Sequence, residues 1–330
     1  MLDCILICVL LIFVSYYRRL KYADNLKNSF EETVAPEKSA LKASKGPLYA
    51  VLAYGSWGFV PLYWKAVGAV PAPQMVAHRI VWSLLTVSFF FINKERRQEL
   101  IAVLTSPRKI AWMFGSALFL SSNWLLFVYA VQQKWLLQVS LGYFINPLVN
   151  VVLGAVILKE RLNRLQILAF LLASIGVSIY GVGLNSFPYF SIALALTFGL
   201  YGLMRKQAPV EPMVGLAVES ILLLPLAVGY LIYQYSQGQL VFGQDWQLAL
   251  LIVCAGPITS FPLLWFAHAA RNLPLSTLGF FQYIAPTMQF ALAVFLYKEP
   301  FSTTHLLAFI LIWTALATYV GNSVYRLKHR

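Results

Sequence analysis

The chain has 330 residues, of which 60% are hydrophobic and 11% are charged, and its mean hydropathy is +0.71. A soluble domain has roughly 45–50% apolar and about 25% charged residues, so this composition excludes a water-soluble enzyme or binding domain. Cys4, Cys8 and Cys254 have neither the spacing of a disulfide framework nor that of a metal site. We therefore expect no disulfide, no metal and no cofactor.

The chain begins with a short apolar run, Leu2–Tyr17, which ends in two arginines and is followed by a polar stretch to Lys45. The run is short for a membrane span of about 20 residues. Its positive charges follow the apolar part, which argues against a cleaved signal peptide. An eleventh helix, a surface-lying anchor and residues upstream of the true start remain open, and we favour a weakly ordered anchor within an N-terminal extension, residues 1–46.

Beyond the extension, continuous apolar stretches of about 20 residues recur, each long enough to cross a hydrocarbon core of about 30 Å. Strands of membrane barrels are shorter and alternate in polarity. The sequence therefore predicts an all-α integral membrane protein with ten transmembrane helices. These are Leu48–Val67, Pro73–Asn93, Ile110–Val131, Leu136–Leu158, Leu165–Leu184, Phe187–Met204, Met213–Gln234, Trp246–Ala269, Leu275–Leu296 and His305–Asn322.

The net charge of +13 could suggest a protein that binds nucleic acid. The positions of the basic residues instead indicate how the chain is oriented in a membrane. Of the Lys and Arg residues, 21 lie in the two tails and the even-numbered connections, whereas the opposite connections carry only Lys134 and Lys298. Cytoplasmic loops carry the excess of positive charge. We therefore predict a multi-pass protein of the inner membrane, with the lipid bilayer as its partner and both ends of the ten-helix core in the cytoplasm.

The second half of the chain repeats the first at a shift of 139 residues. Pro147 matches Pro286, and Lys159-Glu160 matches Lys298-Glu299. Each half, residues 47–184 and 185–325, contains five predicted helices, so the second half must enter the membrane from the opposite side. Inverted repeats of this kind are typical of transporters that work by alternating access around a site near the midplane.

Four segments resemble a known family. They are Gly55–Leu85, Ser122–Val131, Ser140–Leu162 ("SLGYFINPLVNVVLGAVILKERL") and Ser276–Thr287 ("STLGFFQYIAPT"). They resemble the RarD family of EamA-type transporters, within the drug/metabolite transporter superfamily, over residues 47–325. The resemblance implies ten helices in two EamA units, a central cavity lined mainly by the first four helices of each half, and a chloramphenicol-sensitivity or drug/metabolite permease. Residues 1–45 depart from the family pattern.

Ionisable residues inside the predicted spans are few, and each would cost about 2.5–3.5 kcal/mol if it faced the lipid centre. His78 and Arg79 lie near the external end of the second helix, where they could bind a carboxylate or another electron-rich substrate group. For Arg79, snorkelling to the interface is the alternative.

Glu219 lies about six residues inside the seventh predicted helix, at a depth that mirrors that of Arg79. A carboxylate withdrawn from water can bind and release a proton near neutral pH, so Glu219 is our candidate for proton coupling. A structural partner for a nearby basic or polar group is the equal alternative.

Aromatic and amide side chains in the first, third, fourth and ninth helices complete the predicted substrate site. Prolines in the fourth and ninth helices free backbone carbonyls, and nearby amides and phenols can bind polar ligand groups. Helix kinking and ordinary packing are the alternatives for these positions. The candidates are Trp57, Asn123, Tyr143, Asn146, Gln282, Tyr283 and Gln289.

Together these features predict a permease that exports small metabolites or drugs, with a small-molecule substrate and an optional proton partner. An exchanger of amino acids or other metabolites from the same superfamily is an alternative. An intramembrane enzyme is a weaker one, because such enzymes need an acidic metal cluster, a His-rich site or an activated serine. The spans contain no such cluster. The sequence does not specify the substrate, the coupling ion or the oligomeric state.

Overall fold

A computed structural model describes residues 45–132, 135–182, 188–296 and 303–328. Its regular elements in these ranges are all helices, which confirms the all-α class. In chain order they are α3 (Gly46–Ala66), α4 (Ala72–Ser88), η1 (Phe89–Ile92), α5 (Lys94–Leu104), α6 (Pro107–Gln132), α7 (Leu136–Val156), α8 (Arg164–Val182), α9 (Tyr189–Gln207), α10 (Pro212–Ser236), α11 (Trp246–Asn272), α12 (Leu275–Gln282), α13 (Ile284–Ala291), η2 (Leu292–Leu296) and α14 (Thr303–Lys328). The predicted N-terminal anchor lies outside the described residues.

Acidic side chains start two of the long helices. The first turn of a helix leaves backbone N–H groups without intrahelical partners. Glu211 accepts hydrogen bonds from the N–H groups of Met213 (3.1 Å) and Val214 (3.3 Å) at the start of α10. Asp245 accepts two equivalent bonds at the start of α11. These caps set where the apolar segments become helical.

Each of the ten predicted stretches coincides with helical structure, with ends that differ by a few residues. By length and composition, five helices of the described part could cross a membrane, and two shorter apolar helices, Arg164–Ile179 and Leu306–Tyr319, accompany them. The full number of ten spans stays a prediction. The five long helices are Ala72–Ile92, Pro107–Phe127, Gln138–Val156, Pro212–Ser236 and Trp246–Asn272.

Two elements differ from the sequence prediction. The basic connection after the second predicted span contains a further helix, α5, whose start is capped by Asn93. The predicted helix Leu275–Leu296 is divided at Tyr283 into α12 and α13 and ends in the π-helical turn η2. Pro286 contributes to the division, because it has no N–H to donate to the carbonyl of Gln282 four residues before it, although the matching Pro147 lies inside the undivided helix α7.

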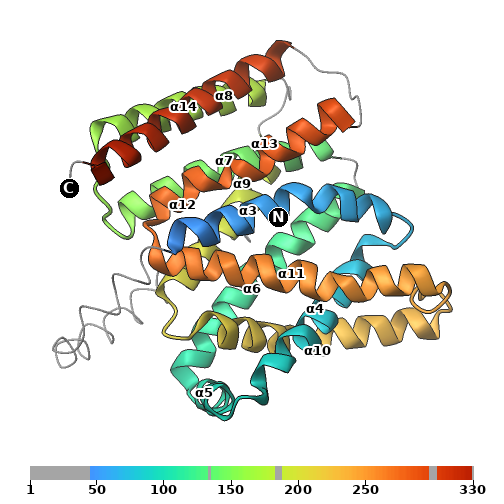
Figure 1. Ribbon diagram of the computed structural model, residues 1–330. Coiled ribbons are helices and arrows are strands. Elements are labelled where there is room, and N and C mark those ends of the chain that lie inside the picture. The colour runs from blue at the N-terminus through green and yellow to red at the C-terminus, as the bar shows by residue number, and fades with distance from the viewer. Residues whose placement is uncertain (1–44, 133–134, 183–187, 297–302, 329–330) are drawn as a thin grey trace. The chain divides into compact units, whose positions relative to one another are not determined.

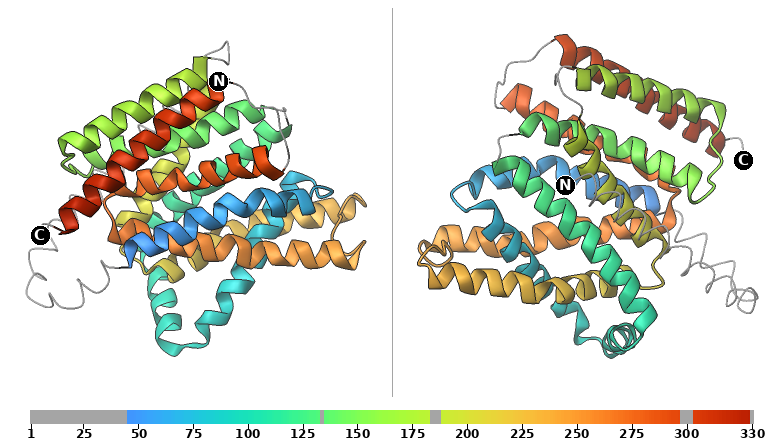
Figure 2. Two further views of the ribbon diagram at one scale, coloured as in Figure 1. Left: turned by 45° about the horizontal axis from the view of Figure 1, so that its top comes forward. Right: turned by 180° about the vertical axis from the view of Figure 1, so that it is seen from behind.

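Most of the helix packing joins the first half of the chain to the second. Helix α8 lies against α14, and α4 lies against α10, on opposite sides of the bundle (Figures 1 and 2). Between these pairs, α7 contacts α9 and α12, and α3 contacts α11 and α13. Helix α6 packs on α9 and α10, and α11 also packs on α4. The two halves therefore share one interior.

A carboxylate of the first half also caps a helix of the second half. Glu160, in the connection after α7, accepts hydrogen bonds from the N–H groups of Leu275 (2.6 Å) and Ser276 (2.9 Å) and from the Ser276 hydroxyl (2.6 Å). These groups form the first turn of α12, where a negative charge also interacts favourably with the helix dipole. The match of this residue to Glu299 cannot be followed further, because position 299 lies outside the described residues.

The crossing of α7 and α12 depends on a glycine. A Cβ atom at Gly279 would lie 2.6 Å from the carbonyl oxygen of Pro147, closer than real Cβ contacts come. Next to this contact, the Asn150 amide donates a hydrogen bond of 2.7 Å to Oε1 of Gln282. Both interactions hold the two halves together at their centre.

We expect Gly279→Ala to destabilise the protein by about 1–3 kcal/mol, the usual cost of overpacking a close-packed contact. Gly229→Ala on α10 is the matched control, because a Cβ atom there meets no other atom within 4 Å. Alanine should stabilise α10 at that position by about 1 kcal/mol through helix propensity. Thermal unfolding of the two purified variants in detergent measures both effects. Equal unfolding temperatures would contradict the packing role of Gly279.

Candidate substrate-binding site

A cavity of about 150 Å³ lies between the two halves, lined by helices of both. Helices α3, α4, α6 and α7 of the first half line it together with α9, α11, α12 and α13 of the second. Helix α10 does not contribute. The lining residues are Tyr54, Trp57, Val60, Tyr63, Trp64, Arg79, Asn123, Trp124, Phe127, Tyr143, Asn146, Phe198, Ile258, Thr259, Leu263, Gln282, Ala285, Pro286 and Gln289.

Aromatic rings form much of the wall. The Trp57 ring lies 5.7 Å from the ring of Phe198 and 5.5 Å from that of Tyr54, both in edge-to-face arrangements. Behind them, Phe266 stacks on Tyr201 at 5.7 Å. Such aromatic pairs are worth about 0.5–1.5 kcal/mol each beyond their burial, so the wall is rigid and apolar.

Arg79 brings a positive charge into this aromatic cavity. Its Nε donates a hydrogen bond of 3.0 Å to Oγ1 of Thr259 on α11. Its guanidinium carbon lies 4.6 Å from the ring centroid of Trp124 and 5.6 Å from that of Trp64. A cation–π contact contributes about 0.5–1 kcal/mol when exposed and about 2 kcal/mol when desolvated. In the described part of the chain, Arg79 forms no ion pair with a carboxylate.

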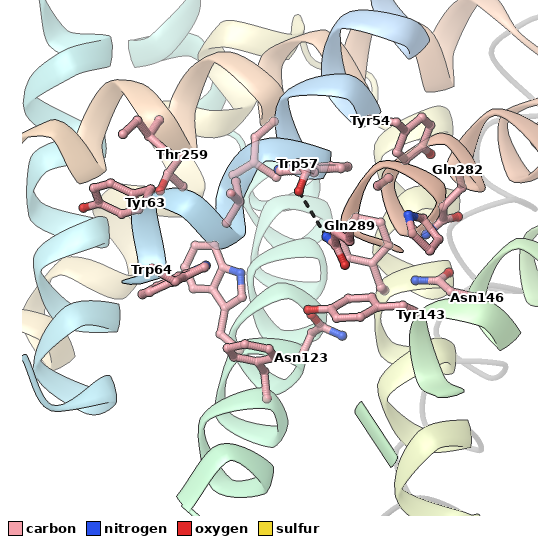
Figure 3. A pocket seen from close by; sticks show the side chains of 18 of the residues that line it. Tyr54, Trp57, Tyr63, Trp64, Asn123, Tyr143, Asn146, Thr259, Gln282 and Gln289 are labelled. Atoms are coloured by element: carbon pink, nitrogen blue, oxygen red, sulfur yellow. Dashed lines mark hydrogen bonds between the residues drawn. The ribbon is translucent and has the colours of Figure 1, made fainter. Parts of the chain in front are cut away.

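The amide groups of the cavity differ in how far their hydrogen bonds are satisfied. The Asn123 amide donates to the carbonyl of Leu194 (2.8 Å), and Gln289 donates to the carbonyl of Trp57 (3.1 Å; Figure 3). Oδ1 of Asn146 is buried and has no hydrogen-bond partner among the described residues. Asn146 and Gln282 lie at the opposite end of the cavity from Tyr63 and Thr259 (Figure 3).

The structure thus brings together most of the residues proposed from the sequence. Trp57, Arg79, Asn123, Tyr143, Asn146, Gln282 and Gln289 all line the cavity. His78 and Tyr283 do not: the His78 ring lies 5.1 Å from the Phe242 ring, and the Tyr283 hydroxyl donates to the carbonyl of Phe144 (3.4 Å).

Glu219 lies outside the cavity, in a buried polar cluster. Its Oε1 accepts a hydrogen bond of 2.5 Å from Ser116 of α6 and lies 3.4 Å from Nη1 of Arg205 on α9. Arg205 also donates from Nη2 to the carbonyl of Pro212 (2.8 Å). Both members of the ion pair are almost completely buried, with 2% exposure for Arg205 and 1% for Glu219. The geometry therefore provides the structural partner that we considered as the alternative role of Glu219.

Sequence reasoning missed two residues that matter here. Thr259 looks like an ordinary small residue of an apolar helix, and its bond to Arg79 spans 180 positions of the chain. The distribution of basic residues in the sequence assigns Arg205 to a cytoplasmic connection, whereas the structure buries it in the last turn of α9. The sequence does contain a signal for this ion pair, because Arg205 and Glu219 carry opposite charges on two helices joined by a short turn.

Comparison with known proteins agrees with this architecture. Residues 44–182 match the EamA-like transporter family. An "Uncharacterized transporter" of Vibrio cholerae is 44% identical over 84% of this chain and 92% of its own length. "Protein RarD" of Escherichia coli K12 is 41% identical over 87% of this chain and 97% of its own length.

The chain belongs to the RarD family of EamA-type transporters. It is therefore a membrane transporter, as the resemblance of its four segments implied. A solved structure titled "Crystal structure of protein" covers 84% of this RarD-family chain and 96% of its own, with a TM-score of 0.62 and 19% identity. That likeness concerns the fold alone.

The buried ion pair makes a direct stability prediction. Arg205→Met leaves the Glu219 carboxylate buried without its cation, which should destabilise the protein by about 3–5 kcal/mol. The double variant Arg205→Met/Glu219→Leu removes both charges and should recover most of that loss. Thermal unfolding in detergent distinguishes the two. A double variant no more stable than Arg205→Met would contradict the pairing.

Proposed function

We propose that this protein is a permease, without enzymatic chemistry, that exports a small anionic or strongly polar metabolite across the inner membrane. The observation that carries this proposal is Arg79. Its cationic group lies in a cavity between the two halves, and no carboxylate of the described residues neutralises it. A substrate carboxylate or phosphate fits the terminal nitrogens of a guanidinium in a bidentate manner.

Alternating access between two inverted five-helix repeats is the proposed mechanism, with ten spans in all. The helix contacts support it, because exchanging the halves converts each of the largest contacts between the halves either into another observed contact or into itself. The contact of α7 with α9 corresponds to that of α13 with α3, and the contact of α6 with α9 corresponds to that of α11 with α3. The pairs α4–α10, α7–α12 and α8–α14 correspond to themselves.

The distribution of charge supports an orientation with the ends of the ten-helix core in the cytoplasm. In this orientation Tyr63 and Trp64 lie toward the outside, and they line the cavity. The Asn150–Gln282 hydrogen bond and the Arg205–Glu219 pair lie toward the cytoplasm.

The proposal predicts the effect of removing the Arg79 charge. Arg79→Gln should reduce export at least about tenfold, because a hydrogen bond to a charged group contributes about 1.5–3 kcal/mol. Arg79→Lys keeps the charge but loses the planar fork, so it should retain part of the activity.

Metabolite profiling of the medium of cells that overproduce the parent or each variant measures this effect. Arg97→Gln, on the exposed surface of α5, is the control and should behave as the parent does. If the metabolite profile of cells with Arg79→Gln matched that of cells with the parent, the positive charge of Arg79 would have no role in transport.

The proposed orientation has its own test. In a chain with Cys4, Cys8 and Cys254 replaced by serine, Arg97→Cys should resist a membrane-impermeant thiol reagent in intact cells. Gln237→Cys, after the end of α10, should react with it, because both positions are exposed on the protein and the proposed orientation puts them on opposite sides of the bilayer. The reverse labelling pattern would show that the protein has the opposite orientation in the membrane.

A further inference from the structure

A second, smaller space lies next to the substrate cavity, beside Glu219. Its volume of about 10 Å³ is close to what one water molecule needs. Its polar lining includes Ser83 of α4, Glu219 and Ser220 of α10, and Thr259 of α11. Thr259 lines the substrate cavity as well, and its hydroxyl holds Arg79 there (Figure 3 shows its position).

Two of the residues that line this space carry a buried oxygen atom with no hydrogen-bond partner within the described part of the chain. These atoms are Oε2 of Glu219 and Oγ of Ser83, on side chains that are only 1% and 3% exposed. An unsatisfied buried polar group costs about 1–3 kcal/mol, and buried waters typically form about three hydrogen bonds to such groups. Oε1 of Glu219 is already bonded to Ser116 and paired with Arg205, so Oε2 is the atom that remains for a ligand.

We propose that this space binds one water molecule between Glu219, Ser83 and Thr259, and that Glu219 takes up a proton from the substrate cavity through it. This inference rests on the proposed transport function. The Thr259 hydroxyl accepts its bond from Nε of Arg79, so its own hydrogen remains to be donated toward the water. Thr259 thereby connects the substrate-binding cation to the proton-binding carboxylate.

The charge balance of this step is simple. A proton from the aqueous cavity forms an O–H bond at Oε2 of Glu219, and the carboxylate becomes a neutral carboxyl group. Arg205 keeps its own proton, so the net charge of the pair rises from zero to +1. The attraction between α9 and α10 at this point weakens, while Arg205 keeps its bond to the carbonyl of Pro212. Proton uptake thus weakens the interaction between Glu219 and Arg205 that joins α10 to α9.

The surroundings of Glu219 leave Arg205 as its direct charged partner among the described residues. From α9, Tyr201 also interacts with it electrostatically. The groups that face it from α4, α6 and α11 are Ser83, Ser116 and Thr259, which do not titrate in the physiological range. Among the charged groups at the nearby ends of α5, α10 and α11, Arg271 interacts electrostatically with Arg205, Glu211 and Glu99. Arg96 donates a hydrogen bond to Sδ of Met213.

Infrared spectroscopy of the purified, full-length protein tests this without a substrate or a transport assay. Carbonyl bands of protonated carboxyl groups should appear as the pH is lowered, and the component that belongs to Glu219 should be missing from the spectra of Glu219→Gln. Thermal unfolding of Glu219→Gln confirms that this variant is folded. If the pH-dependent carboxyl bands of the parent and of folded Glu219→Gln are the same, with no component lost, the proposal is overturned.

The role of the water is tested by Thr259→Val, which keeps the shape of the side chain and removes its hydroxyl. We expect the midpoint of the Glu219 band to move by roughly one pH unit, the size of one hydrogen bond. Thr314→Val is the control, because Thr314 is exposed on α14 and bonds only within its own helix. If the Glu219 band had the same midpoint pH in Thr259→Val as in Thr314→Val, the proposed link from Thr259 to Glu219 would be overturned. This holds whatever the outcome of the Arg79 export experiment.

Discussion

The hydrocarbon core of a bilayer offers no hydrogen-bond partners, and this constraint organises the interior of the protein. Polar side chains within the helices find their partners on other helices, as Asn123 does on α9 and Asn150 does on α12. The charged pair Arg205–Glu219 follows the same rule across α9 and α10. Arg79 is arranged differently, because two indole rings and one hydroxyl hold it and leave its terminal nitrogens to the cavity.

Much of this could be predicted from the sequence, because depth in a membrane helix is a local property. The apolar stretches define the helices, and the position of Arg79 within its stretch places the charge inside the protein. The partners could not be predicted, since Thr259 is 180 residues from Arg79 and no local pattern connects them. The count of basic residues assigns Arg205 to a cytoplasmic connection, although it is buried and paired with a carboxylate of the next helix.

The two charges at mirrored depths have different surroundings. Arg79 faces the cavity, whereas Glu219 lies behind it against Arg205 and Ser116. In the proposed repeat, helix packing is therefore conserved between the halves while the chemistry is divided between them. In the proposed mechanism, one half provides the cation for the substrate and the other provides the carboxylate for the proton. Thr259 lines the space beside each of these two groups.

The cap that Glu160 forms on α12 has a consequence for how the protein is made. Its partners lie 115 and 116 residues further along the chain, so they leave the ribosome long after Glu160 has reached the membrane. Until α12 is inserted, the carboxylate remains at the membrane surface without the N–H groups that it finally binds. The end of α7 therefore reaches its final state late in biogenesis, when the second half is already in the bilayer. A first half synthesised alone would lack this final folding step.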